Sequence, residues 1–431
     1  MKIGFAGLTH LGIHYSLASA DRGFETVAFQ SDAVLVKNLS QGIFPVSEPG
    51  LQELWERAKQ SIRYIFEPHD LRDCEVVFIA LDVVTDEENR ADLQPLFTLL
   101  DQVIQEMNPE GTLVVMSQVQ PGFMTGLRKR WPTFQGKIFY QVETLAFGTA
   151  VERAVKPERY MVGAEKDVRS IEKLPMAYRQ WLESFGCPIL LMRYESAELA
   201  KIAINQYLIA SVTVTNTLAA ICENQGANWQ EIVPALKLDR RIGPYAYLQP
   251  GLGIAGGNLE RDLVAVRQMA VHGGTDDSFP IAAQTNSGWS ADWAWREIQK
   301  RGLDQSDKTV SVLGLAYKID THSVKNSPAL RLLKKIEAPS KKGWDPQVKV
   351  DSKWNLKRYE FSASASDSLK NVDAVVVMTP WKEFIPLGEK ELESMRGRCV
   401  IDPMGIWEKY DLGSRGFDYV RMGLGKEKIE S

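Results

Sequence analysis

The stretch that decides the fold is the N-terminal segment MKIGFAGLTHLGIHYS, Met1 to Ser16. A short apolar run, Ile3 to Ala6, leads through the glycine-spaced turn Gly7-Leu8-Thr9-His10-Leu11-Gly12 into a segment of helical length. A strand that enters a helix through such a turn is the opening unit of a parallel α/β sheet. One lysine and a short apolar run before the glycines also argue against a signal peptide.

The same alternation continues outward from this segment. Strand-like runs at residues 26–29, 76–80, 112–116 and 138–140 are separated by helix-length stretches, which predicts βαβ units with helices on both faces of a sheet. A run without glycine or proline from Glu195 to about Glu223 predicts one long helix, and residues 279–300 predict a second.

A second α/β region begins near Lys308, where TVSVLGLAY repeats the theme of a strand followed by a glycine. Two more strand candidates follow at residues 373–378 and 399–402. We therefore predict an N-terminal domain at 1–192, a central helical region at 193–305 and a smaller C-terminal α/β domain at 306–431. The polar segment KRGLDQSDK is the expected linker before the last domain.

Composition excludes several classes of function. The 431 residues are 44% hydrophobic and 25% charged, with a net charge of −4 and interspersed signs, so we expect no nucleic-acid or membrane partner. No apolar run approaches the roughly 20 residues that span a bilayer, and the cytoplasm is the expected location. The four cysteines show no C-x-x-C or Cys/His ligand spacing, so we expect buried thiols, no disulfides and no metal site.

The first turn approximates the dinucleotide fingerprint G-x-G-x-x-G. Gly7 and Gly12 match, Thr9 replaces the second glycine, and His10 and Leu11 complete the turn that would face the phosphates. Gln30 stands where an acidic residue usually holds the adenosine ribose. The turn predicts NAD as the cofactor, but Thr9 and Gln30 leave its binding in doubt. The alternative is a doubly wound fold whose first helix binds nothing tightly.

Four stretches in order along nearly the whole chain resemble signatures of the UDP-glucose/GDP-mannose dehydrogenase family. They are QGIFPVSEPGLQEL at 41–54, SAELAKIAINQYL at 196–208, DRRIGPYAYLQPGLGIAGGNLERD at 239–262 and GLAYKIDTHSVKNSPAL at 314–330. The resemblance implies two Rossmann-like doubly wound domains joined by a long central helix that builds a homodimer. It also implies oxidation of the primary alcohol of a nucleotide sugar to a carboxylate, with NAD and without a metal.

The resemblance assigns catalytic roles to four residues. Lys201 and Asn205, at i and i+4 of one helix, would stabilise negative charge on the substrate oxygen. Glu143 matches the general base for water, and Asp262 the acid that places water and tunes the lysine. From the residues alone, a solvated helix surface is the preferred interpretation of Lys201 and Asn205, and the flanking match to the family favours the catalytic one. Asp262 could be an ordinary acid near a helix N-terminus.

Asn258 stands where the family has its nucleophilic cysteine, and an amide cannot form the covalent bond to an aldehyde that a thiolate forms. Asp82-Val83-Val84 likewise replaces the Gly-Thr-Pro that lines the cofactor. The remaining assignments by resemblance concern binding. Arg241 would reach the substrate across a dimer, and the loop glycines Gly251, Gly253 and Gly256 would let backbone amides approach it. Lys318 would lie near the substrate diphosphate, and Lys325 would contact a phosphate on the cofactor side as a point charge.

Two main hypotheses follow. The first is an NAD-dependent nucleotide-sugar dehydrogenase of the UDP-glucose 6-dehydrogenase type, whose reaction stops at the aldehyde or continues slowly through its hydrate. The second is a nucleotide-sugar-binding protein without redox activity. A third, epimerisation with a tightly held cofactor, finds no tyrosine/lysine dyad of the usual kind to support it.

Overall fold

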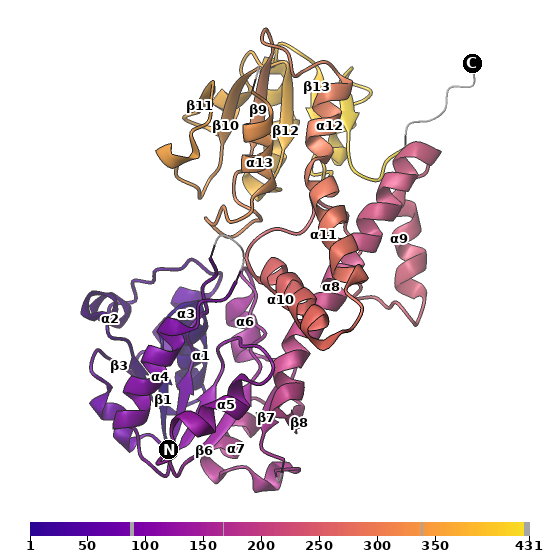
Figure 1. The fold of residues 1–431 in the computed structure, drawn as a ribbon. Coiled ribbons are helices and arrows are strands. Elements are labelled where there is room, and N and C mark those ends of the chain that lie inside the picture. Colours follow the sequence, from indigo (N-terminus) through magenta and orange to yellow (C-terminus); the bar gives the residue numbers. More distant parts are fainter. Residues whose placement is uncertain (87–89, 167, 338, 426–431) are drawn as a thin grey trace. The chain divides into compact units, whose positions relative to one another are not determined.

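A computed structural model describes residues 1–86, 90–166, 168–337 and 339–425 of the chain (Figure 1). The chain forms two compact units, Met1–Ile204 and Asn205–Ser431. Each unit contains one large sheet, and the long helix α8 (Tyr194–Gln225) passes through the boundary between them.

The first unit is built on an eight-stranded sheet with the strand order β3-β2-β1-β4-β5-β6-β7-β8. The first six strands follow the doubly wound order 3-2-1-4-5-6, whose switch point lies between β1 and β4. β7 pairs antiparallel with β6, and β8 is parallel to β7. The strands are β1 (Lys2–Ala6), β2 (Glu25–Phe29), β3 (Ile62–Ile65), β4 (Val76–Ile79), β5 (Thr112–Val115), β6 (Lys137–Gln141), β7 (Tyr160–Ala164) and β8 (Ile189–Arg193).

β1 lies inside the sheet, between β2 and β4, and is buried on both faces, as a strand in a covered parallel sheet must be. Ile3 and Phe5 pack in a cluster with α1 and α7, whereas Ala6 packs in a cluster with α4 and α5. Helices therefore cover both faces of this sheet. They are α1 (His10–Asp21), α2 (Ala33–Ser40), α3 (Leu51–Ala58), α4 (Gln94–Glu106), α5 (Phe123–Arg130), α6 (Ala150–Val155) and α7 (Met176–Glu183).

The second unit begins within α8. The extent of this helix confirms the long helix expected from Glu195 to about Glu223. The run expected at 279–300 forms two helices that are separated at Asp292. The Asp292 carboxylate pairs there with Arg331 and Lys335. The helices of this region are α9 (Trp229–Leu238), α10 (Asn258–Gly273), α11 (Ser278–Ala291) and α12 (Trp293–Lys300). No described helix is long and apolar enough to cross a membrane.

The second sheet has the order β11-β10-β9-β12-β13-β14, again the 3-2-1-4-5-6 pattern, with parallel pairs throughout. Its first turn uses Gly314 at a φ of 86°, and the amides of Leu315 and Ala316 donate to the buried carboxylate of Asp345 at 2.6 and 3.0 Å. The elements are β9 (Thr309–Leu313), α13 (Pro328–Lys335), β10 (Ser340–Trp344), β11 (Tyr359–Phe361), α14 (Ala365–Leu369), β12 (Ala374–Val377), β13 (Cys399–Ile401) and β14 (Asp418–Val420).

The fold class expected from the sequence, two Rossmann-like doubly wound sheets with a long helix between them, is confirmed. The strands that went unpredicted include β3, whose short run is interrupted by Arg63, and β8, whose apolar residues Ile189–Met192 lie directly before the long helix α8. The domain boundaries 1–192, 193–305 and 306–431 stay a prediction. Cys74, Cys222 and Cys399 are buried, as expected, and Cys187 is partly exposed.

Candidate functional site

The first βα turn keeps the two glycines that its backbone requires. Gly7 has a φ of 90°, and a Cβ there would lie 2.9 Å from Leu81 Cβ. A Cβ on Gly12 would lie 2.0 Å from the carbonyl oxygen of Gly7, so a side chain at position 12 is excluded. The turn has the glycines of a loop that binds the phosphates of a dinucleotide, and it lies beside the switch point of the sheet as such a loop does.

The amide end of α1 differs from that expectation. Leu11 N donates to Asp82 Oδ2 at 3.0 Å, and the Thr9 hydroxyl accepts from Asp82 N at 2.9 Å. Because β4 neighbours β1, the residue after β4 reaches the turn after β1. The carboxylate of Asp82 thus takes an amide that a cofactor phosphate would use, and it brings negative charge to a helix N-terminus.

The end of β2 also uses its polar side chains internally. Gln30 Oε1 accepts from Ser31 N at 2.9 Å. Asp32 caps α2, because its Oδ1 accepts from Val34 N and Leu35 N. Gln30 follows β2, where a ribose contact is predicted from the sequence, and a glutamine there could hydrogen-bond a ribose without adding charge.

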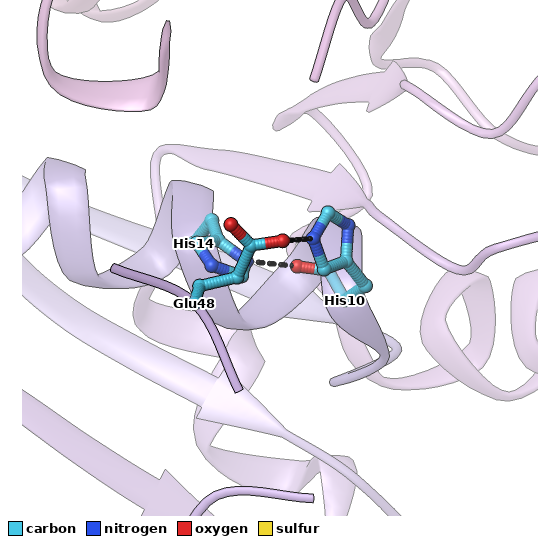
Figure 2. A group of neighbouring side chains, drawn as sticks. All are labelled: His10, His14 and Glu48. Atoms are coloured by element: carbon cyan, nitrogen blue, oxygen red, sulfur yellow. Dashed lines mark hydrogen bonds and ion pairs between the residues drawn. The ribbon is translucent and has the colours of Figure 1, made fainter. Parts of the chain in front are cut away.

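His10, predicted in the cofactor turn, contacts the buried Glu48 (Figure 2). His10 Nε2 lies 3.0 Å from Glu48 Oε1, and Glu48 Oε2 accepts from Gly148 N at 2.8 Å. His14, one turn further along α1, is fully buried, and its Nδ1 lies 2.6 Å from the carbonyl oxygen of His10. Burial and the nearby His10 lower the pKa of His14 to about 4. Burial alone would raise the pKa of Glu48, but the hydrogen bond from His10 and its charge bring that pKa below its ordinary value.

Among the predicted catalytic residues, the structure brings Lys201 and Glu143 together in the first unit. Lys201 Nζ lies 2.9 Å from Glu143 Oε1, and the two side chains are 10% and 15% exposed. Lys201 lies on α8, whereas Glu143 follows β6 and turns its Oε2 toward Leu145 N at 3.0 Å. A buried ion pair of this kind is not the solvated surface lysine that the sequence left open.

In the second unit, Asn205 and Asp262 form the other pair. Asn205 Nδ2 donates to Asp262 Oδ2 at 2.5 Å, and Arg261 Nε lies 3.1 Å from Asp262 Oδ1. All three residues are buried. Since α8 is continuous through residues 201 and 205, Lys201 and Asn205 are one helical turn apart, each held by its own carboxylate.

The loop before α10 is tied to residues 317–327 of the same unit. Gly253 and Gly256 both have positive φ, and a Cβ on Gly256 would lie 2.8 Å from the ring of Tyr317. Gly256 N donates to the carbonyl of Lys325 at 3.2 Å, and Asn326 Nδ2 donates to the carbonyl of Gly256 at 2.9 Å. Gly251 N donates to Asn216 Oδ1 at 2.8 Å. Close packing therefore explains Gly253 and Gly256 without a ligand.

Asn258 is exposed and is the first residue of α10. Glu260, two residues later, is an acidic residue in the first turn of α10. Burial raises its pKa to about 7, although its contact with Asn326 and the charge of Lys325 act in the opposite direction.

The predicted binding residues Arg241, Lys318 and Lys325 lie in the second unit. The Arg241 side chain is 89% exposed and pairs with Asp239 at 2.7 Å. Lys318 Nζ lies 5.9 Å from the centroid of the Tyr317 ring, and Lys325 takes part in the loop contact above through its backbone. Lys325 thus belongs to a different unit from the other predicted cofactor residues, Gly7, Thr9, His10, Leu11, Gly12 and Gln30.

The motif pattern missed three residues that lie around the first turn: Asp82 as an acceptor, and His14 and Glu48 as neighbours of His10. The spacing H-x-x-x-H in HLGIH was the available signal for His14, since i and i+4 share a helix face. Glu48 comes from a distant loop, and only the tertiary fold reveals its position.

Two sheets that each contain six parallel strands in the order 3-2-1-4-5-6, the first with a glycine turn at its switch point, define a protein of the double Rossmann class. Three family models match in sequence: the NAD binding domain of the UDP-glucose/GDP-mannose dehydrogenase family at residues 1–182, its central domain at 195–287 and its UDP binding domain at 311–409. The chain belongs to the UDP-glucose/GDP-mannose dehydrogenase family, and it carries that family's NAD and UDP binding domains.

Relatives and solved structures agree over nearly the full length. The chain is 29% identical to UDP-glucose 6-dehydrogenase AglM of Haloferax volcanii, covering 97% of this chain and 99% of the relative. It is 27% identical to UDP-glucose 6-dehydrogenase of Rickettsia typhi, covering 98% and 99%. A UDP-glucose dehydrogenase structure from Pyrobaculum islandicum shares the fold, with a TM-score of 0.79, 22% identity and coverage of 93% and 96%.

Proposed function

We propose that this protein is an NAD-dependent nucleotide-sugar dehydrogenase that oxidises the primary alcohol of a UDP-glucose-like sugar and releases the aldehyde. The observation that carries the proposal is the buried pair of Lys201 and Glu143, placed one turn of α8 before Asn205. A buried ion pair contributes little to stability, so charge stabilisation at a reacting oxygen gives a reason for its presence.

The first oxidation converts the alcohol to an aldehyde with loss of one proton and one hydride. NAD supplies the acceptor for that hydride. Lys201 donates to the substrate oxygen as its negative charge develops, and Glu143 holds the ammonium in place through the 2.9 Å contact. Asn205 adds an amide donor, because its Nδ2 carries a second hydrogen beyond the one given to Asp262. The Lys201 ammonium passes one proton to Glu143 Oε1, and the resulting amine takes the hydroxyl proton, so Lys201 ends as an ammonium and Glu143 as a carboxylic acid.

Position 258 determines where the reaction ends. The amide of Asn258 has no thiolate chemistry, so a covalent thioester cannot form there. The aldehyde then leaves, or it hydrates and is oxidised slowly as the hydrate. An aldehyde that accumulates and can be trapped by a hydrazine is the expected product.

The second candidate is a nucleotide-sugar-binding protein without redox activity. The bond from Leu11 N to Asp82 favours it, because a phosphate would have to displace this carboxylate. In that case the UDP binding domain would bind its ligand while the first unit would bind no NAD.

Calorimetric titration of the full chain with NAD, with and without UDP-glucose, separates the two. Heat with NAD in the micromolar range supports the dehydrogenase. Binding of UDP-glucose without any heat from NAD overturns the dehydrogenase and leaves the binding protein.

We also propose a homodimer built on the second unit. Several apolar side chains of α8, of α9 and of the segment after α9 are at least 40% exposed. They include Tyr207, Val214, Ile221, Leu238 and Tyr245. In such a dimer the exposed Arg241 of the same segment would contact the second copy. Sedimentation velocity tests this: two copies per particle are expected, with Val214→Glu shifting the particle to one copy. The three-part domain division and a cytoplasmic location remain predictions from the sequence.

A further inference from the structure

We infer that His10, His14 and Glu48 form a binding site for one divalent transition-metal ion, with Zn²⁺ as the first candidate. The inference concerns α1 and the loop before α3, and it stands apart from the dehydrogenase chemistry proposed for Lys201 and Glu143. A metal ion here would be bound at the cofactor turn of the fold.

The geometry of the three side chains supports the site (Figure 2). One ligand atom from each residue lies within 4.8 Å of the others. His10 and His14 are at i and i+4 of α1, and Glu48 Oε1 is 3.0 Å from His10 Nε2. Ligand atoms of a tetrahedral zinc ion are about 3.3 Å apart, so small side-chain rotations close the set.

The hydrogen bonds of His14 fix the ring nitrogen that is available. Its Nδ1 lies 2.6 Å from the carbonyl oxygen of His10, and a carbonyl only accepts, so Nδ1 carries the hydrogen. The lone pair therefore belongs to Nε2. This atom is buried and has no hydrogen-bond partner within the described part of the chain. Metal-bound histidines usually donate their other ring nitrogen to a carbonyl or carboxylate in this way.

Glu48 has a matching arrangement. Its Oε2 accepts from Gly148 N at 2.8 Å, which leaves Oε1 beside His10 Nε2. The Glu48 side chain is fully buried, whereas that of His10 is 11% exposed, so an ion would enter past His10. Two imidazoles and one carboxylate suit zinc and its neighbours better than Mg²⁺ or Ca²⁺, which prefer oxygen ligands. A fourth position remains for water or an anion.

The competing explanation is an ordinary ion pair between His10 and Glu48 beside a neutral His14. It accounts for the 3.0 Å contact, but it leaves the buried Nε2 of His14 unsatisfied. A buried polar atom without a partner destabilises the fold, and a bound ion would satisfy this one. The two explanations differ in one measurable quantity, the metal content of the protein.

The test is metal binding by the full chain after removal of metals with a chelator. Equilibrium dialysis against Zn²⁺ measures stoichiometry, and the visible absorption of bound Co²⁺ reports its ligands. His10→Gln keeps a hydrogen bond to Glu48, and His14→Leu fills the buried space without a ligand. His69→Gln and His272→Gln are the matched controls, because both histidines are exposed.

We expect one equivalent of Zn²⁺ in the native chain and both controls, and binding at least tenfold weaker in His10→Gln and His14→Leu. Circular dichroism verifies that each variant is folded, and His10→Gln, at a partly exposed position, alone suffices if His14→Leu does not fold. The inference is overturned if the native chain binds no stoichiometric metal, or if His10→Gln binds it as tightly as the controls do.

Discussion

Lys201 Nζ lies 2.9 Å from Glu143 Oε1, and only 10% of the Lys201 side chain and 15% of the Glu143 side chain are exposed. Lys201 lies on α8 and Glu143 in the loop after β6, so the fold brings together two residues that are 58 positions apart in the sequence. Perturbed or paired charges away from solvent are typical of functional sites. The pair is the centre of the proposed alcohol oxidation.

Replacement of Lys201 by Met should lower turnover by about 100- to 1,000-fold, the usual loss when one electrostatic donor is removed. NADH formation measures it. Lys129→Met, at an exposed position of α5, should leave turnover unchanged. Because loss of the lysine strands a buried carboxylate, the double variant Lys201→Met/Glu143→Gln separates folding from chemistry: it should fold and remain inactive. Native turnover in either variant would contradict the role.

Asp82 should weaken NAD binding, because its carboxylate accepts from Leu11 N at the start of α1. Asp82→Asn keeps an acceptor and removes the charge, so we expect NAD affinity to rise about tenfold, equivalent to about 1.4 kcal/mol. Calorimetry measures the change. Asp92→Asn is the matched control, since Asp92 also accepts from a nearby backbone amide, that of Gln94. An unchanged affinity in Asp82→Asn would show that this carboxylate does not compete with phosphate.

Gly12 should tolerate no side chain. Its Cβ would lie 2.0 Å from the Gly7 carbonyl, which belongs to backbone that cannot move cheaply. Gly12→Ala should therefore lower the free energy of unfolding by about 3 kcal/mol, as overpacking does in a closed site. Thermal unfolding measures the loss. Gly126→Ala, in α5 with open space around it, should be neutral or slightly stabilising. Equal melting temperatures for the two variants would refute the packing argument.

Glu260 should make stability depend on pH. Its pKa in the fold is about 7, raised by burial from an ordinary value of 4.5. Between these values the folded chain binds more protons than the unfolded chain, so the free energy of unfolding falls as the pH rises from 4.5 to 7. We expect a loss of about 1 kcal/mol, since partial exposure screens the effect. Glu260→Gln should remove this component in denaturant unfolding at pH 5 and pH 7; an identical pH dependence in that variant would contradict it.

The sequence predicts the parts of the fold that depend on local pattern. The strand, glycine turn and helix of residues 1–16 correspond to β1 and α1, and the glycine-free run corresponds to α8. Apolar periodicity reports such buried elements directly. A strand such as β10, whose sequence is SKKGW, leaves no comparable pattern.

Contacts across the sheet are beyond the reach of motif spacing. Asp82 meets Leu11 because β4 pairs with β1, and Glu48 meets His10 because a loop folds over α1. Both residues were visible in the sequence, but their partners were not. The same holds for Glu143, whose position near Lys201 depended on the family resemblance before the fold placed it.

The most direct test of the proposal is the amount of NADH formed per nucleotide sugar consumed, with UDP-glucose, UDP-N-acetylmannosamine and GDP-mannose as substrates. We predict one NADH per sugar and an aldehyde that a hydrazine traps, with Asn258→Cys moving the ratio toward two. No NADH from any of the three sugars would contradict the dehydrogenase. Two NADH per sugar at full rate in the native chain would contradict arrest at the aldehyde.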